Sequence, residues 1–471
     1  MPWRRRGRGR LLRVPGRSLF TRGEGGWQPS QVLTSPSILV FRGQDLTGRA
    51  LVPVVKKGDL VRPGTVLAGP QDAPEDGCLF SPVAGKVVDA GFRPAPDTGG
   101  SGLVPFVAIQ PVAEAGAEKQ GTNRRAGTTP VGDRLRHACR LAGVDPEPLT
   151  TAGIIVFNGC DPDEGVFGRR ALLHERRADV AAGVTAILSG PGAPGNRQGW
   201  LAIAEGTLSA TELAALRRDL LPAEVLLVPA GYPAGRPEML AARFSNAAIV
   251  GVEIAAAVGR SLQTFLPPVD VLVSIGGDAV ARPGTYRVPI GAPVSALLEA
   301  AGVDYARLRL LVRGGYLAGE ALPLEDAYIS LGDLGYLALG DAFLEASPGV
   351  GVCLHCGRCV AICPEGLAPA VLGRLARLHR WEEAARQGAE KCYACGLCAY
   401  ACPARLPLVQ LIRLAQHELS RRKPEKASEE NGRQTGIASS SNGKASPTGK
   451  RPREQQVAVA SCHAEVRLGN R

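Results

Sequence analysis

The sequence has no apolar run that approaches the roughly 18 uninterrupted residues of a membrane-spanning helix. Its basic start, residues 1–10, is not followed by the apolar core of about 7–15 residues that a signal peptide carries. We therefore expect a cytoplasmic protein that reaches the inner face of a membrane only peripherally, through partner proteins. Hydrophobic residues make up 45% of the 471 residues, which is ample for the cores of several domains.

The central part of the chain has little excess charge. The net charge is +11, but residues 1–22 hold eight Arg and no acid, and residues 421–471 hold eleven Lys or Arg against five Glu. These two ends sum to +14, which leaves 11 − 14 = −3 for the remainder. Basic tails of this composition are usually solvated, so we expect disorder over 1–34 and 421–471 and no specific nucleic-acid partner.

Two copies of one cysteine run lie near the C-terminal end. The first comprises Cys353, Cys356, Cys359 and Cys363, and the second Cys392, Cys395, Cys398 and Cys402. Each run reads C-x2-C-x2-C-x3-C-P, the spacing that wraps thiolates around one iron-sulfur cube and gives the last cysteine to a second cube. A zinc site is the alternative, but it leaves no role for the third cysteine or for the proline.

The ferredoxin rule assigns the eight cysteines to two [4Fe-4S] clusters. The first would bind Cys353, Cys356, Cys359 and Cys402, and the second Cys392, Cys395, Cys398 and Cys363. The other four cysteines, Cys78, Cys139, Cys160 and Cys462, are expected to be free thiols. Apolar periodicity predicts a connecting helix over 371–386 and a second helix over 406–419.

Short β-type runs between residues 35 and 112 predict a small sandwich. The runs are 38–41, 51–55, 54–61, 79–88 and 104–109. This pattern resembles the hybrid sandwich of lipoyl and biotin carriers. Lys86 lacks the flanking pattern of a modified carrier lysine, so we expect it to be an ordinary turn residue. An Ala-, Gly- and Thr-rich linker is expected over 113–130.

The region from 131 to 282 alternates strand and helix patterns, which favours a mostly parallel sheet covered by helices. The expected strands are 153–157, 223–229 and 269–275, with a strand-like run at 184–188, and the expected helices are 170–182, 209–220 and 247–263. A smaller unit follows over 283–345, with strands at 286–288 and 308–312 and a helix at 294–301.

The order of these parts is similar to that in the C subunit of the Rnf electron-transport complex. Soluble relatives of that family are the cobalamin reductase of propanediol-using organelles and the electron-transfer protein associated with proline reductase. The similarity depends on the sandwich pattern, on segments 157–159, 231–240, 248–258 and 273–280, on a motif around 285–315, and on the cysteine runs followed by 406–410.

The resemblance implies a multidomain α/β fold. Its parts would be an N-terminal β-sandwich hybrid, lipoyl-like, over 35–112 and a central α/β domain like the complex I flavin subunit over 131–282. A ubiquitin-like β-grasp domain, the soluble-ligand-binding (SLBB) motif, would span 283–345, and a helical, ferredoxin-like double [4Fe-4S] module would span 346–420.

One departure from the family bears on flavin binding. In the family, a glycine-rich loop cradles the flavin phosphate, because side chains would keep backbone N–H groups away from the anion. Residues 141–153 stand at that place with neither clustered glycines nor a helix start. Asp161, Asp163, Glu164 and Asn246 remain as candidates for a residual flavin or nucleotide pocket, so FMN is doubtful.

Three functions remain open on the sequence. The first is an iron-sulfur relay that passes single electrons to a partner reductase or complex, and it is favoured by the missing phosphate loop. The second is a flavin- and NADH-dependent oxidoreductase subunit that feeds the clusters. The third is a non-redox adaptor with structural clusters. Whether the chain is an enzyme in its own right stays open, and no catalytic residue is predicted.

Overall fold

The computed structural model describes the chain in several stretches. These are residues 28–34, 36–42, 51–70, 79–94, 103–112, 131–190, 197–220, 222–244, 247–324, 327–342, 351–422 and 459–460. The expected linker at 113–130, most of the two expected disordered ends, and Asn246, Cys78 and Cys462 lie outside the described residues. The described residues form two compact units, 28–342 with 459–460 and 351–422, and each is considered by itself.

Two antiparallel sheets form the N-terminal part of the first unit. One has the strand order β2-β8-β7-β4 and the other β3-β5-β6. The strands are β2 Leu39–Arg42, β3 Leu51–Pro53, β4 Leu60–Val61, β5 Val66–Pro70, β6 Leu79–Phe80, β7 Gly85–Pro94 and β8 Leu103–Pro111. Lys86 lies within β7, paired with Leu60, so the expectation of a turn at this lysine was wrong.

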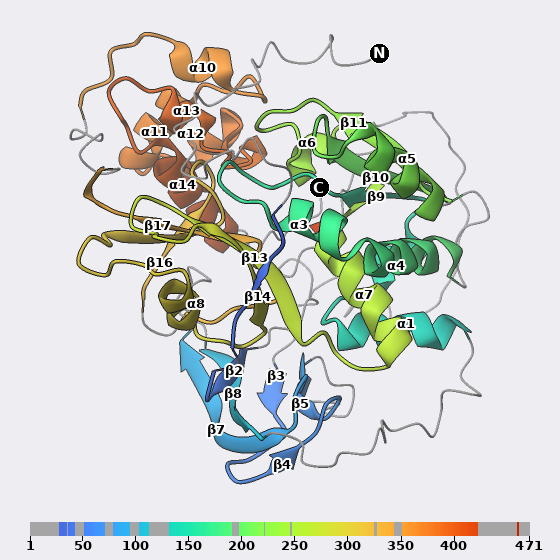
Figure 1. Ribbon diagram of the computed structural model, residues 1–471. Coiled ribbons are helices and arrows are strands. Elements are labelled where there is room, and N and C mark those ends of the chain that lie inside the picture. Colours follow the sequence, from blue (N-terminus) through green and yellow to red (C-terminus); the bar gives the residue numbers. More distant parts are fainter. Residues whose placement is uncertain are drawn as a thin grey trace, which may run out of the picture. The chain divides into compact units, whose positions relative to one another are not determined.

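A parallel sheet with the order β11-β10-β9-β12-β18 follows (Figure 1). Its strands are β9 Ile154–Asn158, β10 Gln198–Ala204, β11 Glu224–Val228, β12 Ala247–Gly251 and β18 Val459–Ala460. Helices α1 Val131–Leu141, α4 Arg177–Ser189 and α7 Val252–Thr264 share one apolar core with this sheet. The short helix α6 Pro237–Ala241 packs on the opposite face, where Leu240 meets Val156 and Ile249. The expected parallel α/β arrangement is therefore present.

A six-stranded mixed sheet completes the first unit, in the order β1-β14-β13-β17-β15-β16. Its elements are β1 Gln31–Val32, β13 Asp270–Gly276, β14 Gly284–Pro289, α8 Val294–Ala300, β15 Leu310–Arg313, β16 Glu320–Leu322 and β17 Gly335–Leu339. Tyr286 and Val288 share a core with Leu39 and Ile109, so the mixed sheet packs against the N-terminal sheets. Strand β13 belongs to this sheet and not to the parallel one.

Three sequence predictions in this unit were wrong in detail. The helix expected over 247–263 is strand β12 followed by α7, because a fully buried apolar run reads alike as strand or helix. The strand-like run 184–188 lies within helix α4. The helix expected over 170–182 divides at Arg176 into α3 Gly168–Glu175 and α4. The helix expected over 209–220 is α5 Ala210–Asp219, with a capping box at Ser209.

The second unit is a small bundle of short helices. They are α10 Arg358–Ile362, α11 Pro369–Arg377, α12 Trp381–Arg386, the 3₁₀ turn η2 Ala389–Lys391, α13 Leu397–Tyr400 and α14 Leu408–Arg422. Leu372, Trp381, Ile412 and Ala415 form its apolar core. The single helix expected over 371–386 was wrong, because the chain turns between α11 and α12 at His379, which has a φ of 56°.

Among the described residues of both units, no helix combines the length and the apolar character that crossing a bilayer requires.

Helices α4 and α7 cross at two glycines. A Cβ atom at Gly183 would lie 1.8 Å from the backbone oxygen of Ala255, and one at Gly259 would lie 2.1 Å from that of Asp179. Because backbone atoms cannot rotate aside, any larger residue here must push the helices apart.

We expect Gly183→Ala to lower the free energy of unfolding. Alanine gains about 1 kcal/mol of helix propensity, but separating the two packed helices costs more, so the net loss should be about 1–3 kcal/mol. Gly153→Ala is the matched control, because nothing lies within 4 Å of its added Cβ. Thermal unfolding of both variants measures the difference; equal midpoints would contradict the close crossing.

Candidate metal centre

The two cysteine runs adopt the same backbone conformation. Positive φ angles recur at equivalent positions, His355 and Ala394, then Gly357 and Gly396. Each glycine directly precedes a short helix, α10 or α13, that contains the third cysteine of its run. Glycine adopts positive φ at no steric cost, so both runs can turn sharply between their second and third cysteines. The unit is therefore built from a tandem repeat of one cysteine loop.

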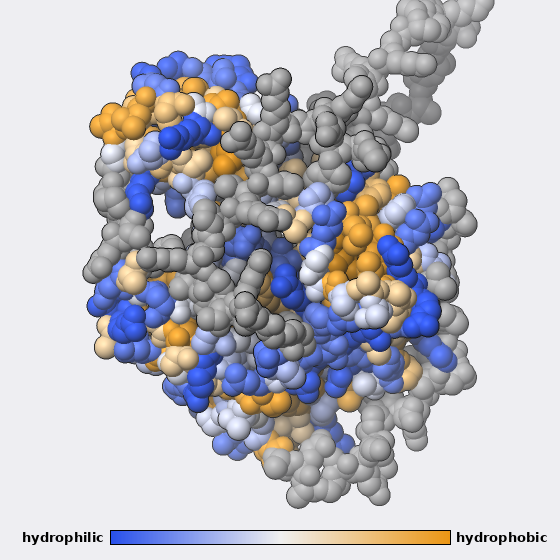
Figure 2. All heavy atoms as spheres, turned by 45° about the horizontal axis from the view of Figure 1, so that its top comes forward, coloured by the Kyte–Doolittle hydropathy of each residue, from blue (hydrophilic) through white to orange (hydrophobic). Residues whose placement is uncertain are grey.

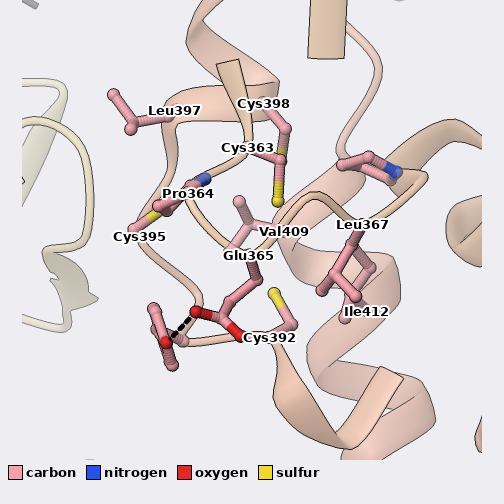
Figure 3. A pocket seen from close by; sticks show the side chains of 12 residues that line it. Cys363, Pro364, Glu365, Leu367, Cys392, Cys395, Leu397, Cys398, Val409 and Ile412 are labelled. Atoms are coloured by element: carbon pink, nitrogen blue, oxygen red, sulfur yellow. Dashed lines mark hydrogen bonds between the residues drawn. The ribbon is translucent and has the colours of Figure 1, made fainter. Parts of the chain in front are cut away.

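Four thiols gather around one pocket, shown in Figure 3. Cys392, Cys395 and Cys398 of the second run line it together with Cys363, the last cysteine of the first run. Apolar side chains complete the wall, and they are Leu367, Leu397, Val409 and Ile412. These four cysteines are the set assigned to the second cluster from the sequence.

Polar contacts hold the loop that carries Cys392. Gln416 of α14 donates from Nε2 to the carbonyl oxygens of Cys392, at 2.8 Å, and Ala389, at 3.0 Å. The backbone N–H of Ala394 donates to the Cys392 sulfur at 3.4 Å. The Tyr393 hydroxyl donates to the Glu365 carboxylate, the dashed contact in Figure 3, and both residues line the pocket. The thiols are therefore positioned by neighbours on both runs and on α14.

The pocket disfavours four bare thiolates. Burial raises the pKa of Cys398 to about 12, and the neighbouring thiols of Cys392, Cys395 and Cys363 add to this effect. Burial also raises the pKa of Cys392, although the N–H of Ala394 opposes it. Thiolates become stable in such a place when iron neutralises them, because cysteine ligands must be deprotonated to bind metal. Four thiols in an apolar pocket thus fit an iron-sulfur cluster.

The first predicted set is less enclosed. Cys353, Cys359 and Cys402 pack around Cys398 and the side chains of Leu406, Leu408 and Val409, whereas Cys356 is exposed. Across the described stretches, no group of three or more His, Cys, Asp or Glu side chains is placed to hold a single metal ion. The structure therefore brings together three of the four first-set cysteines, with Cys356 at the surface.

The acids proposed for a residual flavin pocket bind the protein itself. The buried carboxylate of Asp163 accepts hydrogen bonds from the N–H groups of Leu317, at 2.9 Å, and Ala318, at 2.6 Å. Asp161 accepts a hydrogen bond from the N–H of Arg170 at 3.2 Å and forms an ion pair with its guanidinium. Both carboxylates, which follow strand β9 in the chain, are therefore already bound by backbone N–H groups or an arginine of the same unit.

The segment at the place of the family's phosphate loop forms a short helix, α2 Pro146–Thr151. The expectation that no helix begins here was wrong. Asp145 caps its N-terminus, where the side chain accepts a hydrogen bond from the N–H of Glu147 at 2.9 Å. An anion at that position would meet the Asp145 carboxylate, so this helix start is unsuited to phosphate.

Sequence reasoning missed two supporting contacts. Arg169 is buried and pairs with Glu253 through two hydrogen bonds of 2.8 and 2.9 Å, and it also donates to the carbonyl of Cys160. Gln416 was missed as well, although a polar residue beside the apolar stripe of α14 is a signal that could have located it. No sequence pattern distinguishes Arg169 from a surface arginine.

Comparisons with known proteins agree with this geometry. The family model described as a 4Fe-4S dicluster domain matches residues 352–406, and the SLBB domain matches residues 272–302. The C subunit of the ion-translocating oxidoreductase complex of Rhodobacter capsulatus is 29% identical over 430 residues, covering 84% of this chain and 80% of that protein. The C subunit of the Na(+)-translocating ferredoxin:NAD(+) oxidoreductase complex of Acetobacterium woodii is 25% identical, with 84% and 92% covered.

The predicted similarity to the Rnf C subunit is confirmed by these relatives. Among solved structures, an NAD+-reducing [NiFe]-hydrogenase in the H2-reduced state matches with a TM-score of 0.35 and 17% identity. That match covers 63% of this chain and 60% of the hydrogenase chain. The protein is a mixed α/β chain with a 4Fe-4S dicluster domain.

Asp163 gives the first unit a pH-dependent stability. Burial raises its pKa from 3.8 to about 6, against the lowering effect of the backbone N–H groups. The folded state therefore binds more protons than the unfolded state between these values, so this stabilising contribution is full below 3.8 and is lost as pH rises through about 6.

We expect Asp163→Asn to reduce the gain in stability on acidification. Between about pH 7.5 and pH 5, the wild-type unfolding free energy should increase by about 1 kcal/mol more than that of the variant. Asparagine keeps a side-chain oxygen for the N–H groups of Leu317 and Ala318. Urea unfolding at both pH values measures the difference, and parallel pH profiles would contradict a raised pKa at Asp163.

Proposed function

We propose that this chain, an iron-sulfur electron-transfer protein of the Rnf C-subunit type, passes single electrons through two [4Fe-4S] clusters to a partner reductase or complex. Cys353, Cys356, Cys359 and Cys402 would hold the first cluster, and Cys392, Cys395, Cys398 and Cys363 the second. The clusters, when bound, accept and release one electron each. The chain contributes the ligands, their spacing and their burial.

The observation that carries this proposal is the mixed origin of the thiol pocket. Cys363 comes from the first run, yet it lines the pocket formed by the second run. A zinc site would draw its ligands from two separated cysteine pairs. In a protein with two cubes, by contrast, each run gives its fourth cysteine to the other cluster. The exchange would also keep the two sites close, because each run would give its last cysteine to the other run's site.

The apolar wall of the second site supports a redox role. Val409 and Ile412 of α14 and Leu397 of α13 line the pocket beside the thiols. Burial and hydrogen bonds to the sulfurs are the means by which proteins set cluster potentials. Gln416 acts one step further out, by fixing the loop that carries Cys392.

The relatives suggest the setting. They are named as subunits of ion-translocating and ferredoxin:NAD(+) oxidoreductase complexes, so we propose redox protein partners in such an assembly. The chain would lie in the cytoplasm, peripheral to the inner face of the membrane through those partners. We further propose that its parts correspond to a lipoyl-like sandwich, a flavin-subunit-like α/β domain, a β-grasp SLBB domain and a two-cluster module.

Flavin is not required by this proposal. Asp161 and Asp163 are engaged by Arg170 and by the 317–318 backbone, and Asp145 caps α2 at the place of the phosphate loop. These contacts favour the relay over a flavin- and NADH-dependent subunit.

Analysis of the anaerobically purified protein tests the relay. We expect about eight irons and eight sulfides per chain, since two cubes are predicted, with no flavin and no bleaching of the visible spectrum by NADH. Dithionite should bleach the same sample. One flavin per chain that NADH reduces would overturn the relay in favour of the reductase, and zinc in place of iron would overturn both.

Single cysteine variants test the ligand sets. Cys398→Ala and Cys363→Ala should each remove about four irons and leave the same residual electron paramagnetic resonance spectrum, because both would serve one cube. Cys356→Ala and Cys402→Ala should leave the other spectrum. Cys139→Ala, at a buried free thiol, should retain all the iron. The exchange of fourth cysteines is wrong if Cys363→Ala instead matches Cys356→Ala.

A further inference from the structure

We propose that one face of the N-terminal sheets binds directly to the anionic lipid headgroups of a membrane surface. This face, the β4 face, consists of Lys56, Lys57, Leu60, Arg62 and Lys86. The inference rests on the proposed place of the chain beside a membrane complex, and it adds a contact with the lipid itself that no partner protein mediates.

The β4 face is built from the paired ends of two strands. Leu60 of β4 lies opposite Lys86 of β7 in the antiparallel ladder, so their side chains project from the same side of the sheet. Arg62, two residues after Leu60, is exposed as well, whereas Val61 between them is buried. Strand β4 is the last strand of its sheet, so this face lies at a sheet edge (Figure 1).

Backbone hydrogen bonds fix the lysine turn against β7. The N–H of Gly58 donates to the carbonyl oxygen of Val87 at 2.8 Å, and the N–H of Val87 donates to that of Asp59 at 2.8 Å. The N–H of Asp59 donates to the carbonyl oxygen of Lys56 at 3.1 Å and closes the turn. Among the described residues, chain neighbours apart, no atom lies within 4 Å of a Cβ added at Gly58. The turn therefore presents its two lysines, with open space at its tip, beside the strand that carries Lys86.

The positive charge of the β4 face is local. Residues 28–342 hold 28 Lys or Arg against 32 Asp or Glu, a net charge of 28 − 32 = −4. The face has four cations, and with Asp59 of the turn its charge is 4 − 1 = +3. With the described residues these four cations form no ion pair, and Asp89 of β7 pairs instead with Arg93. All eight predicted cluster ligands lie in the other unit, so no cluster offsets this charge.

Leu60 indicates the kind of anionic partner. Its side chain is 80% exposed amid the cations. An apolar side chain in this position can enter the boundary between headgroups and acyl chains while the cations contact lipid phosphates. Five side chains are too few for a stable protein interface, which takes about 20–30 residues from each partner. The N-terminal sheets lie at the lower edge of Figure 2, where hydrophobic and hydrophilic surface adjoin.

Vesicle binding by the full-length, cluster-loaded chain tests the β4 face. The probes are vesicles of phosphatidylcholine alone and of phosphatidylcholine mixed with phosphatidylglycerol, and sedimentation measures the bound fraction. The wild type should bind the mixed vesicles, less so in high salt, and should not bind the neutral ones. Lys56→Glu/Lys57→Glu should weaken binding by about twentyfold or more, since each cation near an anionic surface contributes about fivefold. Leu60→Ser should weaken it by about tenfold, because the burial of its apolar side chain is lost.

Two matched variants change the same kinds of residue elsewhere in the first unit. Arg217→Glu/Arg218→Glu reverses an adjacent pair of exposed cations on α5, and Leu324→Ser removes an apolar side chain that is 47% exposed. Both should stay within about twofold of the wild type. The β4 face is overturned if these controls weaken binding as much as the face variants, or if the face variants bind like the wild type. It is also overturned if the wild type ignores the mixed vesicles, as it would if the face met an acidic protein instead.

Lysine-directed labelling locates the contact directly. Lys56, Lys57 and Lys86 are the only lysines among the described residues of the first unit, and Lys391 of the other unit serves as an internal reference. Mixed vesicles should slow acetylation of these three lysines severalfold relative to Lys391, and neutral vesicles should leave it unchanged. Unchanged labelling of a vesicle-bound chain would mean that its basic ends make the contact, and the proposal would be wrong.

Two further readouts separate the possible failures. The melting temperature of Leu60→Ser should equal that of the wild type, because the side chain is exposed; a lower value would mean that the chain itself covers the β4 face and would overturn the proposal. Iron content and bleaching by dithionite report on the relay alone. Normal bleaching without vesicle binding overturns only the β4 face, whereas vesicle binding without bleaching overturns only the relay.

Discussion

The helical unit depends on one constraint, the gathering of four thiols in an apolar pocket. Burial raises the pKa of Cys398, which means that its thiolate is disfavoured unless a cation neutralises it. The pocket is held together by α14, which supplies both its apolar wall and the Gln416 contacts to the loop of Cys392. Helix α10 has no buried residue, so clusters bound by this unit would contribute directly to its folding free energy.

The sheet-rich unit shows a different use of polar groups. Its acids near strand β9 bind backbone N–H groups and arginines of the same unit, and the bidentate Arg169–Glu253 pair is buried beside them. These contacts hold the segment after β9 in the region where the relatives are expected to bind a cofactor. Asp163, a buried carboxylate with several internal hydrogen bonds, holds loops of this unit together. Its burial disfavours the ionised form and so raises its pKa.

Much of the architecture was predictable because its signals are local. The cysteine spacing pointed to the four residues that line the thiol pocket, and alternating patterns located β9, β11 and α5. The errors arose where tertiary contacts decide. The run that forms β12 is equally compatible with a helix. The chain turns at His379 between α11 and α12, where the sequence has no glycine or proline to indicate a break. Helix α2 begins at a proline in a segment that we predicted to be a loop. The exposure of Cys356 could not be predicted, since both runs have the same spacing.

The exchange of cysteines between the runs bears on biosynthesis. In a nascent chain, the proposed second site lacks its full set of ligands until Cys398 has been made. The first site lacks its full set until Cys402 has been made, although Cys353 emerges far earlier. Both sites thus become complete almost together, after residues 28–342 have all been translated. Iron delivery must therefore follow synthesis of nearly the entire fold, and the waiting thiols of the first run must be protected from oxidation until then.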